Sequence, residues 1–563
     1  MNKKNLPLLT PRHSRRHFLG AAGTAVGATM LGPTGLGAIA APAPLPNGLQ
    51  SGPDRRPNLL VIITDSEQWR SSYPNDLDLP NHDRLRDQAT TFSRYHVNTI
   101  ACGPSRSVMH SGQHIQKTRV YDNPIMTRYP GRVALDPELT PTLNQILPDR
   151  GYVIKESEEG PGSGHGLAWG GYVNDPVVAE KTASWLQDKA PALAEENPWC
   201  CFVEFSNPHD MMFFDATGNN ENSRVKKGFI GDMLPAPDTP LYKTDLGYPL
   251  PESFDDGLDT KPEAHFAFMR DTNYVHGPIP HENREAWRLA RNYYFNCVRD
   301  MDRHLGTVLD GLEASGLADN TIVLFTSDHG EMSTAHGMWQ KGPLMYKENL
   351  GVPLLISHPD ISGGRETTSL SCALDLVPTI LGMTGMDDSE IAEKYPNLKG
   401  YNLTPSLVQP DAPGPRDINA GGILISVSSV YECNPDLKYK MLTADIPEGI
   451  LGRDFFSFPE DVIQWDIRSF VRGIYDGRYR YARYFSPGQH HIPTDWHTLR
   501  YYNDLELYDT ESDPHEMNNL AFVPEQNQAL IMELNDKLNR LTSQEVGTDD
   551  GSYMPGDPST WDL

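Results

Sequence analysis

Short apolar runs that end in polar residues divide the larger part of this chain. Residues 57–65, 199–206 and 321–327 are mostly aliphatic and aromatic, a pattern typical of strands buried on both faces of a parallel sheet. The first run ends at Asp65, the second leads into an Asn-Pro-His sequence, and the third leads into Asp328. Open α/β sheets bind ligands beyond the carboxyl ends of their strands. We therefore expect these polar residues to meet at one edge of the sheet.

Helical periodicity fills the segments between these runs. In residues 284–315 apolar side chains recur at intervals of three and four up to Gly316, and residues 375–384 predict another helix. Helices that alternate with buried strands indicate an α/β fold. We expect a large mixed, mostly parallel sheet flanked by helices.

The last part of the chain has a different pattern. Residues 472–481 predict a hairpin around an Asp-Gly turn, 506–509 predict a strand, and 525–541 predict a helix. Together they indicate a smaller antiparallel sheet covered by one helix. We therefore place a large domain at 57–415 and a smaller C-terminal α/β subdomain at 416–563.

The N-terminus has the features of an export signal. Arg15 and Arg16 precede Phe-Leu and a mildly apolar run that ends near Leu36, followed by small residues. The paired arginines are similar to a twin-arginine signal, which predicts a signal peptide over 1–41 and a Pro- and Gly-rich linker over 42–56. A chance arginine pair on another signal, or a tethering helix, is the alternative. We expect an exported protein, periplasmic or extracellular.

Composition narrows the range of partners. The 563 residues carry a formal net charge of -27, and nucleic-acid binding needs Lys and Arg at phosphates, so no nucleic-acid partner is expected. A small anion would need a local pocket with its own cations. The six cysteines have no CxxC pair and no zinc-type spacing. Cys200 and Cys201 are expected in the core, and the presence of one disulfide is left open.

One short motif carries the strongest chemical information. The sequence Cys-Gly-Pro-Ser-Arg runs from Cys102 to Arg106, and a Ser-Gly pair follows at 111–112. It resembles the signature of the sulfatase family, in which the cysteine is oxidised to formylglycine, an aldehyde that hydrates to a geminal diol. The segment 506–521 is similar to the C-terminal part of the same family. The resemblance extends from about residue 57 to 521 and implies an alkaline phosphatase-like fold.

The resemblance also implies a metal site. Asp65, Asp328, His329 and the modified Cys102 would bind a divalent cation, since hard cations prefer oxygen ligands. Calcium is the first expectation, with magnesium and manganese open. Many sulfatases carry two consecutive acids after the first strand, whereas here Ser66 follows the aspartate. Choline sulfatases and phosphonate monoester hydrolases also lack the second acid. Either the Ser66 hydroxyl or a water would fill the place of the second acid.

Further residues receive roles by the same resemblance. Arg106 would hold the cysteine-derived group and the oxygens around the metal. Lys341 matches a lysine that contacts the sulfate oxygens. His209 matches a histidine near the leaving group, where it would act as an acid or contact substrate. His336 would bind substrate or only close its loop.

One family motif is missing. Sulfatases usually carry Gly-Lys-Trp-His after a Gly-Tyr-x-Thr segment, and the chain has no such string after its Gly-Tyr pair at 151–152. Lys155 and His165 would substitute for its lysine and histidine, or neither would. We place His165 beside His336 among the candidate substrate contacts. The base that releases sulfate from the intermediate is therefore not assigned.

These observations predict a sulfuric ester hydrolase with a metal-assisted formylglycine nucleophile. A carbohydrate sulfate is the first expected substrate, followed by aryl or choline sulfate, with specificity in the long segment 210–280. A phosphonate monoester or phosphodiester hydrolase on the same scaffold is one alternative, and a non-catalytic exported binding protein with unmodified Cys102 is another. The expected partners are a sulfated small molecule or saccharide, a formylglycine-generating enzyme and the twin-arginine translocase.

Overall fold

A seven-stranded sheet forms the centre of the protein. The computed structural model describes residues 56–123, 140–156, 170–218, 233–429, 432–434, 464–549 and 551. In spatial order, the strands are β4 (Val153–Glu156), β5 (Trp199–Pro208), β1 (Asn58–Asp65), β6 (Thr321–Ser327), β7 (Leu354–Ser357), β2 (Thr90–Phe92) and β8 (Arg365–Thr367). The first four run parallel, and β7 is antiparallel to both of its neighbours. The expected large mixed, mostly parallel sheet is confirmed.

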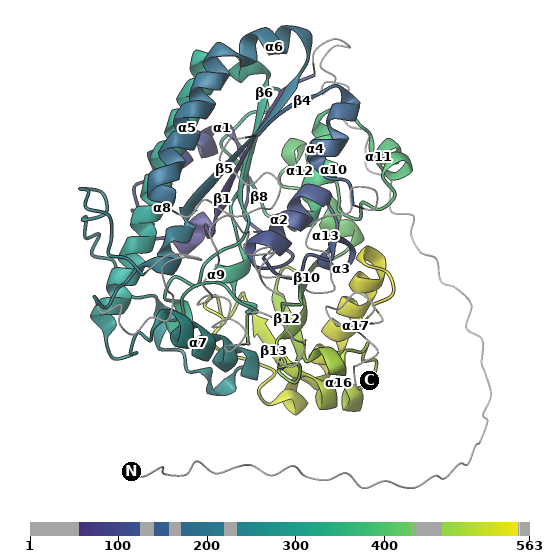
Figure 1. Cartoon of the computed structure of the whole chain (residues 1–563). Helices are drawn as coiled ribbons and strands as arrows, with labels where there is room; N and C mark the ends of the chain where they lie inside the picture. The colour runs from purple at the N-terminus through teal and green to yellow at the C-terminus, as the bar shows by residue number, and fades with distance from the viewer. Residues whose placement is uncertain are drawn as a thin grey trace, which may run out of the picture. The chain divides into compact units, whose positions relative to one another are not determined.

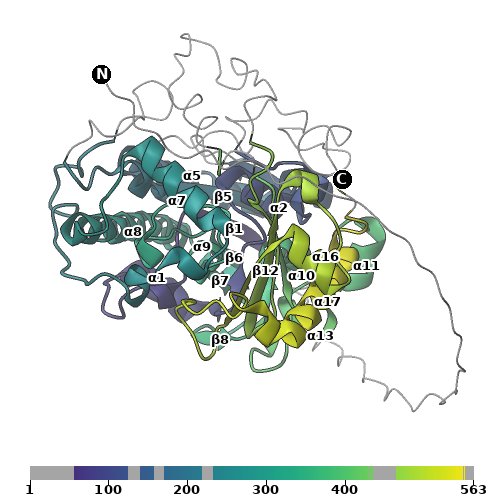
Figure 2. The ribbon, with the colours of Figure 1, turned by 90° about the horizontal axis from the view of Figure 1, so that it is seen from below.

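Helices cover both faces of this sheet (Figures 1 and 2). On one side lie α1 (Pro80–Gln88), α5 (Gly171–Asp188) and α8 (Arg284–Ala314). On the other side lie α2 (Cys102–Ser111) and α10 (Leu376–Met383). The predicted helices at 284–315 and 375–384 are therefore confirmed. The remaining helices are α3 (Ile115–Thr118), α4 (Leu143–Ile146), α6 (Ala190–Glu196), α7 (Glu263–His276), α9 (Lys347–Leu350), α11 (Asp388–Lys394), α12 (Thr404–Val408), α13 (Pro415–Asn419), α16 (Trp496–Tyr502) and α17 (Gln528–Glu545).

The central strand β1 is buried along its whole length. Leu60 and Ile62 pack into the hydrophobic core beneath α5 and α8. Leu59, Val61 and Ile63 pack into the opposite core, beneath α2 and α10. Side chains of a strand alternate between its two faces, so a strand with a core on each side must be apolar at consecutive positions. This is the reason for the uninterrupted apolar run in the sequence.

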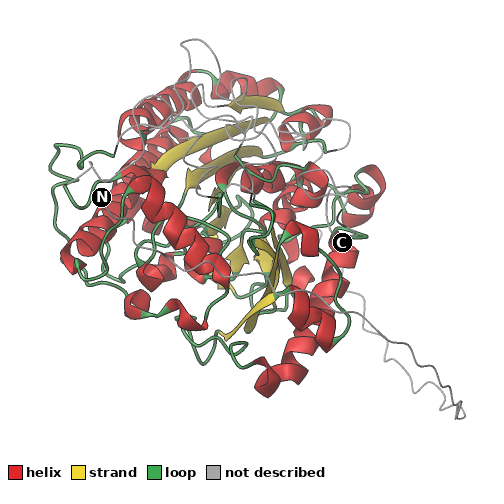
Figure 3. Ribbon diagram, turned by 60° about the horizontal axis from the view of Figure 1, so that its bottom comes forward, coloured by secondary structure: helices red, strands yellow, loops and turns green. Residues whose placement is uncertain are grey.

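A smaller antiparallel sheet follows in the chain (Figure 3). Its order is β10 (Ile423–Val427), β11 (Phe470–Tyr475), β12 (Tyr479–Phe485) and β13 (Asp504–Asp509). The turn between β11 and β12 contains Gly477 at a φ of 99°, a left-handed conformation that glycine adopts without strain. The helix α17 packs on this sheet through Leu534 and Leu538. The hairpin, strand and helix expected in this region are confirmed.

Some of the sequence predictions concern residues outside the described part of the chain, and one concerns a domain boundary. The proposed signal peptide at 1–41 and all but the last residue of the linker at 42–56 lie outside the described residues. The domain boundary between residues 415 and 416 stays a prediction, and the two sheets share one hydrophobic cluster. Among the described residues, no helix has both the length and the apolar character needed to span a bilayer.

A buried histidine ties the loop after β1 to two helices. His82 of α1 has Nε2 3.0 Å from Glu67 Oε1 and Nδ1 2.6 Å from Asp302 Oδ1. Burial lowers the pKa of this imidazole, but the charge of Glu67 and the hydrogen bonds that the ring donates to both carboxylates outweigh burial and raise the pKa to about 9. The ring is therefore charged at neutral pH and fixes Glu67, two residues beyond Asp65.

The contacts of His82 with Glu67 and Asp302 should make the free energy of unfolding depend on pH between about 6.5 and 9. The pKa of His82 is about 9 in the folded protein and 6.5 for a free imidazole, so its contribution is complete below pH 6.5 and disappears as the pH rises through 9. We expect the free energy of unfolding to fall by about 3 kcal/mol over this range, measured by urea denaturation. His82→Gln should flatten the dependence, and the surface variant His497→Gln should retain it. An unchanged slope in His82→Gln would contradict this account.

Candidate functional site

The ends of three parallel strands bring the predicted acids and His209 to one edge of the sheet. Asp65 closes β1 and lies opposite Pro208 of β5, directly before His209. On the other side of β1, Thr64 pairs with Ser327, and the Asp328 amide donates to the Thr64 carbonyl at 3.1 Å. Residues more than a hundred positions apart therefore become neighbours because β1 lies between β5 and β6.

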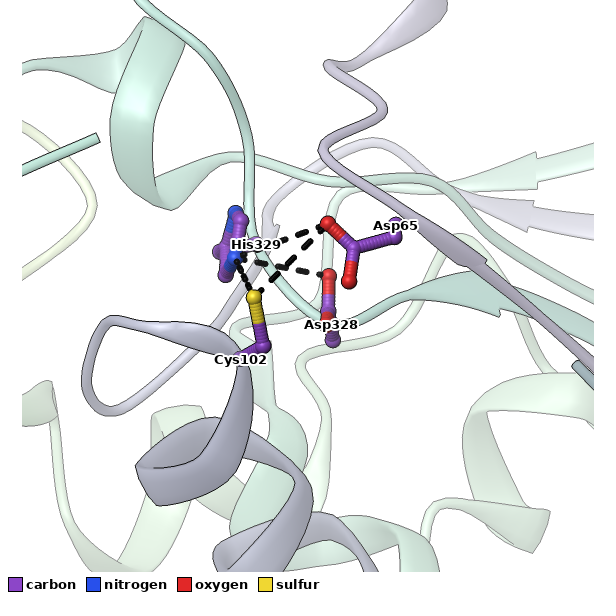
Figure 4. A group of neighbouring side chains, drawn as sticks. All are labelled: Asp65, Cys102, Asp328 and His329. Carbon is purple, nitrogen blue, oxygen red and sulfur yellow. Dashed lines mark hydrogen bonds and ion pairs between the residues drawn. The ribbon is translucent and has the colours of Figure 1, made fainter. Parts of the chain in front are cut away.

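Four side chains converge at this edge (Figure 4). Asp65, Cys102, Asp328 and His329 are all buried, and their ligand-type atoms lie within 4.8 Å of one another. Cys102 begins α2, and its Sγ lies 3.2 Å from His329 Nε2 and 3.8 Å from Asp65 Oδ1. The set predicted from the sequence as metal ligands is thus brought together by the fold.

His329 is held in the tautomer that suits a metal ligand. Its Nδ1 lies 2.8 Å from the Gly330 carbonyl, which can only accept, so Nδ1 carries the proton. The Nε2 lone pair then faces the cluster, 3.7 Å from Asp328 Oδ1. Burial, followed by the positive charge of Lys341, lowers the pKa of His329 to about 3. The imidazole is neutral at physiological pH, as metal binding requires.

Arg106 links the carboxylates around the cluster. Its Nε donates to Asp328 Oδ2 at 2.9 Å, one terminal nitrogen donates to Glu204 Oε2 at 2.7 Å, and the other lies 3.4 Å from Asp65 Oδ2. All four side chains are at most 3% exposed. Arg106 therefore orients the two acids from behind. The contacts present are with carboxylates, and the expected role toward the cysteine-derived group stays a prediction.

Ser66 stands where many sulfatases have the second acid. Its hydroxyl donates to Asp65 Oδ1 at 3.0 Å, and its amide donates to Asp328 Oδ1 at 3.3 Å. Its φ of 73° turns the chain sharply after the strand and aims the amide at Asp328. In this arrangement Ser66 orients both carboxylates through hydrogen bonds.

The two acids have opposite pKa shifts. Burial raises the pKa of Asp65, but the nearby His209, His329 and Lys341 outweigh burial and hold the pKa well below its usual range. Burial and the charge of Asp65 raise the pKa of Asp328. Two neighbouring carboxylates that are both removed from water can be ionised at the same time only when a cation lies beside them. Two carboxylates with one neutral imidazole fit a hard divalent ion.

Lys341 and His209 complete the electrostatics of the edge. Lys341 is 4% exposed, and although burial lowers its pKa, the charges of Cys102, Asp65 and Glu331 raise it overall, so the ammonium stays charged. Burial and the charge of Lys341 lower the pKa of His209 to about 3. His209 is thus neutral, which favours a substrate contact over proton donation among its two predicted roles.

The other predicted residues lie apart from the cluster or outside the described chain. His336 Nδ1 lies 2.8 Å from Asp256 Oδ2, and its ring stacks on Tyr346 at 3.7 Å between centroids. His165 lies outside the described residues. Lys155 on β4 pairs with Cys201, which is level with Leu60 of β1 and well before Asp65. The sheet register therefore separates Lys155 from the strand ends.

Glu204 is a site residue that the sequence reasoning missed. It lies on β5 between apolar neighbours, is 4% exposed, and bonds Arg106. Its other oxygen lies 3.6 Å from His110 Nε2. A charged residue within the otherwise apolar run 199–206 was the signal that could have identified it, because an unpaired buried charge is rarely tolerated.

The part of the chain that carries this cluster is similar to a known protein family. A family model described as Sulfatase matches residues 57–386. The chain belongs to the sulfatase family. Sulfatases are sulfuric ester hydrolases, so the predicted family and enzyme class are confirmed.

Curated relatives of this sulfatase include two named enzymes. Choline-sulfatase of Rhizobium meliloti is 26% identical over 395 residues, which cover 62% of this chain and 72% of that protein. Arylsulfatase K of Bos taurus is 27% identical over 404 residues, which cover 66% of this chain and 70% of that protein.

Solved structures show the same fold. The phosphonate monoester hydrolase of Agrobacterium radiobacter has a TM-score of 0.59 at 18% identity and covers 87% of this chain and 96% of its own. A protein solved in complex with its substrate D-glucosamine-2-N,6-O-disulfate has a TM-score of 0.56 at 18% identity and covers 88% of this chain and 100% of its own. At these identities the likeness concerns the fold alone.

Metal binding by this cluster should be visible without any activity assay. A ligand at 100 times its Kd stabilises the folded state by about 2.7 kcal/mol, so Ca²⁺ should raise the unfolding temperature of chelator-treated protein, with Mg²⁺ and Mn²⁺ tested in parallel. Asp328→Asn removes a buried ligand charge and should abolish the increase, whereas the exposed Asp319→Asn should keep it. The same increase in Asp328→Asn as in the wild type would place the metal elsewhere.

Proposed function

We propose that this sulfatase hydrolyses a saccharide sulfate with residue 102 as its nucleophile, after oxidation of the cysteine to formylglycine. The observation that carries the proposal is the place of Cys102, at the first turn of α2 and inside the buried set of Asp65, Asp328 and His329. Burial and the neighbouring carboxylates raise the pKa of the unmodified thiol, and a protonated thiol is a weak nucleophile. Such a position suits a residue that acts after modification.

The residues around Cys102 have the charges and ligand atoms that hydrolysis of a sulfate monoester requires. Asp65, Asp328 and His329 would hold a divalent cation, calcium first, which when bound neutralises anionic charge and lowers the pKa of an adjacent hydroxyl. Arg106 keeps the two aspartates in place. Lys341 adds a further positive charge at this edge.

Lys341 and His209 would contact the substrate. Lys341 is charged and buried, so in this low-dielectric site it stabilises negative charge that develops on the sulfate oxygens. His209 is neutral, so it would contact the ester as an uncharged imidazole. The saccharide class rests on the likeness to the protein solved with glucosamine disulfate.

Residue 102 should carry an aldehyde in the mature protein. We expect the tryptic peptide 95–106, from a host with a formylglycine-generating system, to have the aldehyde mass, and Cys102→Ala to lose metal-dependent turnover of 4-nitrophenyl sulfate. An intact thiol beside a fully converted control sulfatase would contradict the mechanism and favour a binding protein or a different hydrolase. Faster turnover of an aryl phosphonate than of the aryl sulfate would instead assign the site to phosphonate monoesters.

Lys341→Gln should lower kcat because the substitution removes the buried charge that faces the sulfate. Loss of one stabilising group of this kind reduces kcat by about 10²- to 10³-fold. The exposed Lys394→Gln is the matched control and should leave steady-state kinetics unchanged. Lys341→Gln kinetics equal to those of this control would remove Lys341 from the mechanism.

A further inference from the structure

The loop 332–340, which precedes Lys341, has an unusual backbone conformation. Four of its residues other than glycine have a positive φ: Ser333 at 41°, Thr334 at 76°, His336 at 54° and Gln340 at 70°. Residues with a Cβ rarely adopt this region, so a loop that contains several of them keeps its shape only when its surroundings fix it. The contacts that fix this loop therefore determine where Lys341 lies.

A single carboxylate joins the two ends of the loop. Glu331 Oε1 accepts a hydrogen bond from the Gln340 amide and a second from the Ser333 amide at 3.4 Å. A backbone hydrogen bond from the Met332 amide to the Gln340 carbonyl, at 3.0 Å, closes the same turn. Glu331 is 2% exposed, so water hardly competes for these amides. The carboxylate thus accepts from backbone donors that no helix or strand serves.

The backbone of Glu331 is itself fixed. Its amide donates to the Glu348 carbonyl at 2.9 Å, and the Gly330 amide donates to the Asn349 carbonyl at 3.0 Å, which binds the chain after β6 to α9. The side-chain amide of Gln68 donates to the Glu331 carbonyl. The Glu331 side chain therefore extends from a well-anchored point of the backbone.

Lys341 depends on this arrangement because it follows Gln340 directly. Its side chain is 4% exposed, and its ammonium interacts with the charges of Asp65 and Cys102. A displacement of the Gln340 amide would move the backbone from which the Lys341 side chain extends. Misplacement of a catalytic group by about 1 Å can lower a rate by about 10²-fold.

The middle of the loop is held by other residues. His336 Nδ1 lies 2.8 Å from Asp256 Oδ2, and Asp256 in turn lies 3.0 Å from Lys261 Nζ. The His336 ring stacks on Tyr346. None of these contacts involves Glu331. A change at Glu331 should therefore release the ends of the loop and leave its middle in place.

Glu331 differs from the other buried acids near this edge. Asp65, Glu204 and Asp328 all pair with Arg106, whereas Glu331 forms no ion pair with any residue that the structure describes. A buried carboxylate without an ion pair is costly unless hydrogen bonds satisfy it. The two loop amides supply those bonds, so they define what Glu331 does in this fold.

We propose that Glu331 is the positioning residue for Lys341 and acts through its hydrogen bonds to the amides at the two ends of the loop 332–340. This assignment rests on the proposed function, in which the Lys341 ammonium stabilises charge on the sulfate oxygens. Glu331 fixes the backbone before Lys341, so that the ammonium meets those oxygens as negative charge develops on them.

Two variants separate the hydrogen bonds of Glu331 from its charge. Glu331→Asp keeps the carboxylate but shortens the side chain by one methylene, which withdraws the acceptor from the amides. Glu331→Gln removes the charge and keeps an oxygen at the same place as an acceptor. Glu393→Asp and Glu393→Gln, at an exposed position of α11, are the matched controls.

We expect Glu331→Asp to lower kcat for 4-nitrophenyl sulfate in the metal-loaded, formylglycine-bearing protein by about 10- to 100-fold, with a smaller change in KM. Glu331→Gln should recover most of this loss, and both Glu393 variants should match the wild type. In Lys341→Gln protein, Glu331→Asp should have little further effect, because the group that Glu331 positions is gone. A purely structural role would lower stability and leave the kcat of the folded enzyme unchanged.

The metal set should be unaffected, because Glu331 is not among the predicted ligands. Ca²⁺ should therefore raise the unfolding temperature of chelator-treated Glu331→Asp protein as much as that of the wild type. Loss of this increase would show that Glu331 supports the metal set, and would overturn its assignment to Lys341.

The failures of the two proposals are distinguishable. A kcat unchanged in Glu331→Asp, a larger loss in Glu331→Gln than in Glu331→Asp, or an equal loss from Glu331→Asp with and without Lys341 overturns the positioning role and leaves the proposed function standing. No hydrolysis of the sulfate ester by the wild type overturns the proposed function, and the positioning role with it.

Discussion

The buried guanidinium of Arg106 is the interaction on which the rest of the site depends. It contacts Asp65, Glu204 and Asp328 at once, and each of these carboxylates is almost completely removed from water. Removing one partner from a buried ionic group leaves uncompensated charge and is strongly destabilising. Arg106 therefore helps to hold the acids of the strand ends at metal-binding distance, together with Lys341.

The scaffold supplies that cation from a different part of the chain. Arg106 lies one turn into α2, on the same helix whose first residue is Cys102. Residues four apart on a helix share one face, so the helix that presents the nucleophile precursor also carries the arginine that fixes the acids. Ser105 adds a hydrogen bond from its hydroxyl to the Asp328 carbonyl, which ties α2 to the end of β6. One helical turn thus presents the nucleophile precursor, orients the acids and joins α2 to the end of β6.

A second buried network positions His336. His336 stacks on Tyr346, whose hydroxyl lies 3.2 Å from His265 Nδ1. His265 in turn lies 3.4 Å from Glu506 on β13 of the smaller sheet. The C-terminal segment that resembles the family tail thus positions His336 through buried side chains.

The sequence by itself determined the fold class, the predicted ligand set and the order of the elements. The apolar runs that form β1, β5 and β6 can be recognised in the sequence because both faces of these strands are buried. The helical spacing of apolar residues identified α8 and α17. The residues Asp65, Cys102, Asp328 and His329 were identified through a local motif and through strand ends. Only the tertiary structure decided the rest. Glu204 became a site residue, and Lys155 was placed away from the strand ends, because sheet register fixes neighbours across long separations in the chain.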